Sequence, residues 1–461
     1  MQPSNLVARI IEKVRETRSP GLSMIMERVN EFPSELQAQL TGIALDSGAR
    51  DVANKAMDRA FRTNRSLVNI PGNTDELIIG SGFHAAVYAA TRVLLGKQMP
   101  LILESAPTIG GVFAIPGQDG TYPGVFNLNS RNRRGLAGIS RDNEAQLNYL
   151  PGAPIQASAL SNAEYQTNAD MAFIIRLTFA QSGYTRVFPS AKVISVDGPL
   201  GEPETFAITY RSYGTDDERI IRAKRVIDST GLGDPKNGDR ANGESILTFP
   251  QFMNRMSGMW PLRGLRNVAV IGGGDSGKCA VESFLGLAPQ SFMSAAELDT
   301  VNRLDWFANN VESDYEDYCR ANRGRYRAIG RYLRPDAMGN QKLNVFNQVV
   351  SPIALPSGGV LINGRQYDLV VIATGNDRIT IPGMDWFYNE RIYADDARRS
   401  RTIAVRNEED FGQAQRFRIG PRAEIDFDSE ESANGVSDIG NNKVAMFRLA
   451  TRTAVLATKL S

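Results

Sequence analysis

Two short apolar runs, each leading into a glycine-rich turn, dominate the pattern of this chain. Residues 76–79 and 267–271 have strand length, and apolar residues at helical spacing follow each turn. A second apolar run, at 101–104 and at 303–307, comes after each helical stretch. The pattern therefore predicts two strand–helix–strand units, which indicates an α/β fold with two Rossmann-like nucleotide-binding domains.

Between the two units, apolar and polar residues alternate with the period of antiparallel strands, and glycines separate the runs. We expect a β-meander inserted in the first domain, with strands at 192–196, 206–210, 219–223 and 225–229. The last of these runs into Thr230-Gly231. A later strand, at 369–373, ends in Thr374-Gly375 in the same way, so it looks like a second copy of this element.

Both ends of the chain have helical patterns. The beginning predicts an N-terminal helical extension that packs on the body of the protein or on a second subunit, so that a homo-oligomer would form through these helices; a regulatory or partner-binding arm is the alternative. Residues 442–460 predict a final helix. We expect four segments: the extension at 1–72, a first nucleotide-binding domain at 73–262, a second at 263–378, and a return to the first domain at 379–461.

Composition excludes several classes of function. The chain has 461 residues, 42% of them hydrophobic and 22% charged, with a net charge of +1. Such a balanced charge offers no global attraction to nucleic acid or anionic lipid. We find no apolar run of about 18 residues, as a membrane span would need. The first residues carry both signs of charge, unlike a signal peptide, so we expect a cytoplasmic protein.

Scarce cysteine and histidine narrow the chemistry further. Cys279 and Cys319 form no C-x-x-C pair, which argues against a dithiol redox centre. His84 is the single histidine, so a histidine-rich metal site cannot be built, and we expect no metal. Because His84 lies inside the first glycine-rich turn, we expect it to be structural or to contact a cofactor, with catalysis as the weaker alternative.

The first turn has the spacing of a dinucleotide-binding motif. Gly80 allows the tight turn, Gly82 lets the backbone approach a pyrophosphate, and Ala85 permits close packing of helix on strand. The start of the helix then offers unpaired N–H groups to the phosphates. Glu104 closes the second strand, where a carboxylate accepts hydrogen bonds from a ribose 2′-hydroxyl. The predicted contacts are Gly80, Ser81, Gly82, Phe83, His84, Ala85, Glu104 and Ser105.

The second turn satisfies the same motif with a triple glycine. Its predicted contacts are Gly272, Gly274, Asp275, Ser276 and Gly277. No clear acid follows the second strand of this unit, and Asp305, within the strand, could point either way. Downstream arginines, among them Arg320 and Arg323, could grip a 2′-phosphate, although a solvated basic helix is the alternative. We therefore expect NADPH here, with NADH as the alternative.

These motifs together resemble the two-dinucleotide flavoprotein superfamily of the glutathione-reductase type, over roughly residues 75 to 460. In that superfamily a Gly-Gly follows the acid of the first site, a β-meander is inserted, and the next strand ends in Thr-Gly. Gly110-Gly111-Val112-Phe113 and Gly231 match this order. The resemblance implies FAD at the first turn and a nicotinamide at the second, with Gly110, Gly111, Val112, Phe113, Gly231, Thr374 and Gly375 near the cofactors.

Within the superfamily, residues 122–131 resemble class B flavin-dependent monooxygenases. Tyr122-Pro123-Gly124 matches their Baeyer–Villiger members, and Asn129-Ser130 matches the start of an Asn-Ser-Ser of their N- and S-oxygenating members. By that resemblance Asn129, Ser130 and Arg131 are the catalytic candidates, although a loop-capping amide and an ordinary salt bridge are the alternatives for Asn129 and Arg131. The Baeyer–Villiger fingerprint itself is absent, because it needs a histidine beyond His84.

The C-terminal segment also departs from the disulfide reductases. Gly420-Pro421 stands where those enzymes have Gly-Asp, and this is more like a monooxygenase. Asn441 precedes the predicted last helix, whose N-terminus could face the flavin, although a plain N-cap is the alternative.

The resemblance implies a single-component monooxygenase, which would use NADPH, FAD and O₂ to form a hydroperoxyflavin that oxygenates or halogenates a small molecule. Two alternatives stay open. The first is a flavin-dependent reductase or dehydrogenase that passes electrons to a quinone, a small substrate or a protein. The second is a non-enzymatic flavoprotein scaffold.

Overall fold

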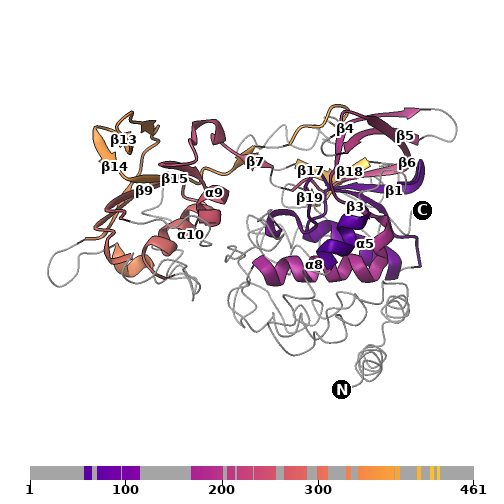
Figure 1. Cartoon of the computed structure of the whole chain (residues 1–461), viewed down its shortest axis with the longest axis horizontal. Coiled ribbons are helices and arrows are strands. Elements are labelled where there is room, and N and C mark those ends of the chain that lie inside the picture. Colours follow the sequence, from indigo (N-terminus) through magenta and orange to yellow (C-terminus); the bar gives the residue numbers. More distant parts are fainter. Residues whose placement is uncertain are drawn as a thin grey trace, which may run out of the picture. The chain divides into compact units, whose positions relative to one another are not determined.

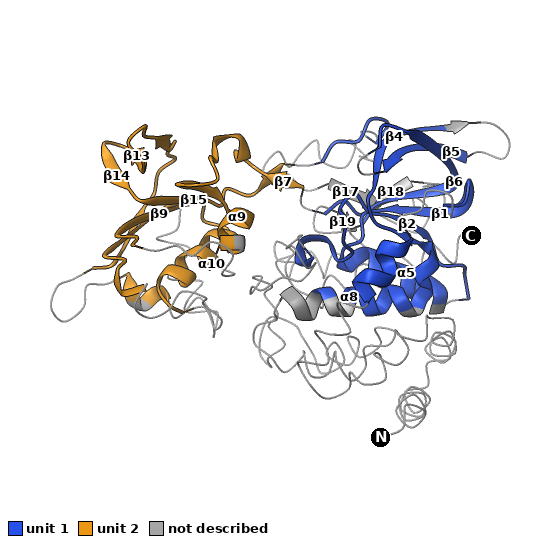
Figure 2. Ribbon diagram, in the orientation of Figure 1, with its two compact units in different colours: residues 1–122, 128–232, 379–461 blue, residues 123–127, 233–378 orange. Residues whose placement is uncertain are grey.

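The structure of the chain is a computed structural model (Figure 1). It describes residues 57–64, 70–94, 96–114, 168–200, 205–212, 215–231, 233–255, 264–287, 298–309, 329–333, 341–377, 379–384, 402–405, 416–419 and 423–425. These residues fall into two compact units (Figure 2). The first unit holds the described residues from 57 to 231 and from 379 onward, and the second holds those from 233 to 377. The second unit thus begins before the boundary that the sequence predicted at 262–263.

The first unit is built on a sheet with the strand order β3-β2-β1-β6-β5-β4, and β18 pairs with the end of β6. The strands β3, β2, β1, β6 and β18 are parallel, whereas β6, β5 and β4 form an antiparallel meander. Its elements are β1 (Asn73–Ile79), α5 (Phe83–Leu94), β2 (Leu101–Leu103), η3 (Gly111–Phe113), α8 (Asn168–Gly183), η4 (Tyr184–Arg186), β3 (Val187–Phe188), β4 (Ala191–Leu200), β5 (Thr205–Ser212), β6 (Glu218–Asp228), β17 (Thr402–Val405), β18 (Arg416–Arg418) and β19 (Ala423–Ile425).

The alternation of side chains in β1 divides the two faces of this sheet. Leu77 and Ile79 belong to a buried cluster with the meander residues Phe206, Ile208 and Tyr210. The helices α5 and α8 lie on the opposite face (Figure 1). The meander therefore covers one side of the parallel strands, and the helices cover the other.

One detail of the meander differs from the sequence prediction. Residues 219–223 and 225–229 were expected to be separate strands, yet they are the two halves of the continuous strand β6. The first half pairs antiparallel with β5, and the second half pairs parallel with β18. All of β6 from Arg222 to Asp228 also pairs with β1.

The second unit has a five-stranded parallel sheet with the order β11-β10-β9-β15-β8. A small antiparallel sheet, β12-β13-β14, covers one face, and α9 and α10 cover the other. Its elements are β7 (Asp234–Pro235), η5 (Gly238–Arg240), β8 (Ile246–Thr248), α9 (Phe249–Asn254), β9 (Asn267–Ile271), α10 (Asp275–Phe284), β10 (Arg303–Phe307), η7 (Gly330–Tyr332), β11 (Leu343–Phe346), β12 (Ile353–Ala354), β13 (Val360–Ile362), β14 (Arg365–Tyr367), β15 (Leu369–Ile372) and β16 (Asn376–Asp377).

The fold class predicted from the sequence is confirmed: two parallel α/β sheets, one of them with a β-meander. Of the N-terminal extension the structure describes a helix at 57–63, Asn64, and residues 70–72 before β1. The predicted final helix lies outside the described residues. Among the helices in the described part of the chain, none has both the length and the apolar character needed to cross a membrane.

Candidate functional site

The two glycine-rich turns, one in each unit, are held by the same pattern of backbone hydrogen bonds. In the first unit, Gly80 N donates to Leu103 O (2.8 Å), and Ser229 N donates to Ile79 O (2.9 Å). In the second unit, the matching bonds are Gly272 N to Phe307 O (2.8 Å) and Ala373 N to Ile271 O (2.7 Å). Each turn is therefore held between a neighbouring strand on one side and the segment that leads to Thr-Gly on the other.

The backbone around each turn requires glycine at the first motif position, Gly80 in the first turn and Gly272 in the second. Gly80 has φ 100° and Gly272 has φ 127°, in the region that side chains rarely adopt. A Cβ atom at Gly80 would collide with the carbonyl oxygen of Ser229, and one at Gly272 would collide with that of Ala373. Glycine at these two positions thus serves chain packing.

The second glycine of the G-x-G-x-x-G motif, Gly82 in the first turn and Gly274 in the second, has a different environment. Among the residues that the structure describes, none has an atom within 4 Å of a Cβ built at Gly82 or Gly274, and neither glycine has a positive φ. The described residues thus leave open space beside the backbone of Gly82 and of Gly274, at the start of a helix in both units. Ala86 N donates to Gly82 O (3.1 Å) and Lys278 N donates to Gly274 O (3.0 Å) at the start of the two helices. The backbone N–H groups that precede Ala86 and Lys278 in the first helical turn therefore have no partner within the helix. Such a place suits a phosphate.

Both carboxylate oxygens of Glu104 accept hydrogen bonds, and Oε2 binds the first turn. Its Oε2 accepts from Ser81 N (2.9 Å) and Ser81 Oγ (2.8 Å), and its Oε1 accepts from Ala106 N (2.8 Å) and Ser105 Oγ (3.3 Å). A carboxylate has about four acceptor positions, so these bonds occupy its capacity. The sequence predicted Glu104 as a ribose acceptor; the structure adds that it fastens the turn.

The Gly-Gly segment is brought against this turn. Gly110 N donates to Ser81 Oγ (3.2 Å), and a Cβ at Gly111 would lie 3.0 Å from Gly82 Cα. Val112 is exposed, and Phe113 is buried. The residues predicted around the first site, from Gly80 to Ala85 and from Glu104 to Phe113, therefore form one cluster in space, and Gly231 follows Ser229 and Thr230 beside it.

His84 is buried within this cluster, with its ring edge-on to that of Phe83. Burial lowers the pKa of His84 to about 3, so the imidazole is neutral near pH 7. Its Nε2 has no hydrogen-bond partner among the described residues. A neutral, buried imidazole is unsuited to general acid catalysis, which favours the structural or cofactor-contacting role.

We expect His84 to make the apoprotein sensitive to acid. The unfolded chain binds a proton near pH 6.5 and the folded chain only near pH 3, so stability is complete above pH 6.5 and falls as the pH drops toward 3. Between pH 6.5 and 5 the loss is ~2 kcal/mol. Urea unfolding of the wild type and of His84→Gln should show a steeper pH dependence for the wild type. Parallel curves would contradict this assignment.

In the second unit, the residue that takes the place of Glu104 is Ala308. Glu104 N donates to Phe188 O (3.0 Å), and Ala308 N donates to Phe346 O (3.0 Å), each directly after the strand that holds the glycine turn. No acid therefore stands where a ribose 2′-hydroxyl would be bound. Asp275 begins α10, with Gly274 as its N-cap residue, and Ser276 lies in its first turn. Gly277 packs against the Gly272 carbonyl.

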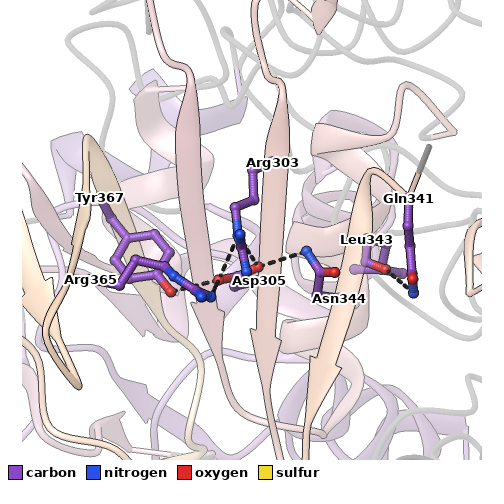
Figure 3. A network of polar contacts seen from close by, with 7 residues as sticks. All are labelled: Arg303, Asp305, Gln341, Leu343, Asn344, Arg365 and Tyr367. Atoms are coloured by element: carbon purple, nitrogen blue, oxygen red, sulfur yellow. Dashed lines mark hydrogen bonds and ion pairs between the residues drawn. The ribbon is translucent and has the colours of Figure 1, made fainter. Parts of the chain in front are cut away.

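Asp305, whose orientation the sequence left open, faces the small sheet, and its carboxylate is bound within the protein (Figure 3). It accepts from Tyr367 Oη (2.6 Å), Arg303 Nε (2.8 Å), Asn344 Nδ2 (2.9 Å) and Arg365 (3.0 Å). Burial alone would raise the pKa of Asp305, but these hydrogen bonds together hold it below its ordinary value. The carboxylate anchors the small sheet and is no ribose acceptor.

Trp306 is a functional candidate that sequence reasoning missed. It is fully buried in the core of the second unit. Its indole Nε1 also donates to the Gly272 carbonyl (2.8 Å), which fixes the peptide of the second turn. Only a long-range contact reveals this role, because a tryptophan in a buried strand gives no such signal in sequence.

Trp306→Phe should therefore weaken nicotinamide binding more than it weakens the fold. The ring still packs, but the Gly272 carbonyl loses a buried donor, so we expect about tenfold weaker binding of the nicotinamide cofactor. A binding titration of the variant checks this, with FAD affinity as the internal control. Equal nicotinamide affinity in both proteins would show that the indole donor has no part in the site.

Of the other predicted residues, Thr374 and Gly375 follow β15 beside Gly272. Thr374 Oγ1 donates to Lys236 O (3.2 Å), and Lys236 N donates to Gly375 O (2.9 Å). Cys279 is buried in the core of the second unit. The remaining candidates lie outside the described residues: Asn129, Ser130, Arg131, Arg320, Arg323, Gly420 and Asn441.

Comparison with solved structures identifies the fold. The chain shares its fold with a solved monooxygenase and a solved hydroxylase. The cadaverine monooxygenase DfoA of Erwinia amylovora, solved with FAD bound, aligns with 84% of this chain and 94% of its own, with a TM-score of 0.51 and 11% identity. The reduced ornithine hydroxylase PvdA of Pseudomonas aeruginosa aligns with 84% of this chain and 99% of its own, with a TM-score of 0.51 and 14% identity. No family model and no curated protein sequence matches the chain.

Proposed function

We propose that this chain is an NADPH-dependent FAD monooxygenase that acts on a small molecule in the cytoplasm. The observation that carries the proposal is the doubled turn, with open backbone at Gly82 and at Gly274. Packing gives no reason for glycine at these positions, whereas close approach of a pyrophosphate does. Two such sites in one chain suit two dinucleotides.

The residues around the first turn fit FAD. Glu104 and the Gly110-Gly111 segment lie on the turn, and a ribose hydroxyl would reach the carboxylate in place of its longest bond, from Ser105 Oγ. The second turn suits NADPH, since Ala308 replaces the acid that would repel a 2′-phosphate. The predicted 2′-phosphate contacts Arg320 and Arg323 and the predicted catalytic residues Asn129, Ser130 and Arg131 belong to the same proposal.

When bound, FAD would take a hydride from NADPH and reduce O₂, and the protein residues would position the two cofactors. In balance, substrate, O₂, NADPH and a proton give hydroxylated substrate, water and NADP⁺. The similar solved structures act on cadaverine and ornithine, so primary amines are the first substrates to test.

The decisive experiment measures reduction and product in one preparation. FAD-loaded protein is mixed with NADPH or NADH without oxygen, and flavin absorbance is followed. Oxygen is then admitted with or without cadaverine or ornithine, and hydroxylated amine and hydrogen peroxide are quantified. Hydroxylated product in proportion to NADPH supports a monooxygenase of amines. Rapid reduction with peroxide as the sole product, whatever amine is offered, favours the reductase alternative. If neither NADPH nor NADH reduces the bound flavin, the result favours the non-enzymatic scaffold.

A further inference from the structure

Arg176, in the middle of α8, is a fully buried arginine between the N-terminal extension and the first glycine turn. Its Nε donates to Ile109 O (2.9 Å), and a terminal guanidinium nitrogen lies 3.4 Å from Asp58 Oδ1. Burial lowers the pKa of Arg176 to about 10, while the charge of Asp58 opposes this shift. The side chain is therefore a buried cation at neutral pH, and it depends on the carboxylate.

Asp58 belongs to the helix at 57–63 of the N-terminal extension. Its side chain is buried, and its other oxygen is 2.6 Å from an Arg62 guanidinium nitrogen. Met57 and Phe61 of the same helix are buried as well. Asn64, directly after the helix, donates through Nδ2 to Tyr184 O (2.6 Å) and to Val187 O (3.2 Å). This end of the extension is thus fixed to the first unit by packing and by polar contacts.

The other partner of Arg176 leads to the candidate FAD site. Ile109 directly precedes Gly110, whose N–H donates to Ser81 Oγ (3.2 Å) in the glycine turn. Thr108 Oγ1 donates to Ala114 O (2.6 Å), which closes the loop around Gly110 and Gly111. The carbonyl held by Arg176 is therefore one residue away from the segment that lies on Gly82.

We propose that Asp58 and Arg176 form a positioning pair through which the N-terminal extension sets the geometry of the FAD site. Asp58 keeps the guanidinium charged and oriented, and Arg176 holds the Ile109 carbonyl so that Gly110 and Gly111 stay on the turn. The extension then contributes to cofactor affinity as well as to packing. This inference rests on the proposed binding of FAD at the first turn.

The test uses the full-length chain and measures FAD affinity and visible circular dichroism of the bound flavin. The variants are Asp58→Asn and Arg176→Met, with Asp58→Glu as the conservative rescue. Asp58→Asn removes the ion-pair partner of Arg176, and Arg176→Met removes the charge-assisted hydrogen bond to Ile109 O. Each variant is expected to weaken FAD binding about tenfold and to change the flavin spectrum. Asp58→Glu should recover part of the affinity, and nicotinamide affinity should stay unchanged.

Arg92→Met is the matched control. Arg92 is also a buried arginine of the first unit, paired with Glu76 (2.8 Å), but it lies in the last turn of α5, away from the glycine turn. It should lower thermal stability without changing FAD affinity of the folded protein. If Asp58→Asn weakens FAD binding no more than Arg92→Met does, the inference is overturned. If the wild type binds no FAD, the proposed function itself fails. If Arg176→Met does not fold, the FAD affinity of Asp58→Asn alone tests the inference.

Discussion

Gly82→Leu is expected to abolish FAD binding while the protein stays folded. A Cβ at this position meets no atom of the described residues within 4 Å, so we expect the fold to tolerate a side chain there, yet this side chain fills the space through which a pyrophosphate would approach. We expect affinity for FAD to fall at least about a hundredfold, beyond what the loss of a single contact produces. Flavin retention after gel filtration and a fluorescence titration measure this loss.

The matched control is Gly72→Leu. Gly72 precedes β1 in the same unit, and a Cβ built there would likewise lie more than 4 Å from any atom in the described part of the chain. This variant should keep full FAD affinity. If Gly82→Leu also retained FAD, the first turn would not be the FAD site.

The same substitution at Gly274 separates the two sites. Gly274→Leu should lose the nicotinamide cofactor and keep FAD, because the open turn it fills belongs to the second unit. Its flavin should still be reduced by dithionite but no longer by NADPH. Loss of FAD in this variant would contradict the assignment of one cofactor to each turn.

Asp228→Asn is expected to cause the largest loss of stability in the first unit. The buried carboxylate at the end of β6 accepts from Arg418 through Nε (2.5 Å) and a second guanidinium nitrogen, and from Thr230 through N (3.0 Å) and Oγ1 (2.7 Å). Removing the charge takes away the carboxylate with which the buried Arg418 guanidinium is paired, and breaking a buried ion pair costs about 3–5 kcal/mol. Urea unfolding of the apoprotein gives the measurement.

Asp75→Asn supplies the comparison. Asp75 forms an ion pair with Lys224 (2.8 Å), but both side chains are exposed. An exposed pair contributes about 0–1 kcal/mol, so this variant should unfold almost as the wild type does. Equal stability of the two variants would mean that the Asp228–Arg418 contact does not hold β18 to β6.

The sequence predicted the two strand–turn–helix segments because their determinants are local. An apolar strand, a glycine spacing and a helical stripe lie within twenty or so residues of one another, and 303–307 is confirmed as β10 without change. Glu104 and Gly110-Gly111 could be placed at the first turn because their order after it matches a known pattern. The structure then showed how Ser81 joins them.

The features that were missed depend on long-range contacts. The helix α8, which packs against α5, has apolar and polar residues on every side and so lacks an amphipathic stripe. The link from Asp58 to Arg176 spans more than a hundred residues, and that from Asp228 to Arg418 spans 190. The hydrogen bond from Trp306 to the Gly272 carbonyl likewise corresponds to no local sequence pattern. Periodicity cannot pair such positions.

The difference between the two kinds of glycine has an evolutionary consequence. A descendant of this protein that stopped binding nucleotides would still have to keep Gly80 and Gly272, because neighbouring carbonyls exclude a side chain there. Gly82 and Gly274 would be under no such constraint and would drift first, to alanine, serine or larger residues. In a set of related chains, the first glycines would therefore mark descent of the fold, and the second glycines would mark which branches still hold their cofactors.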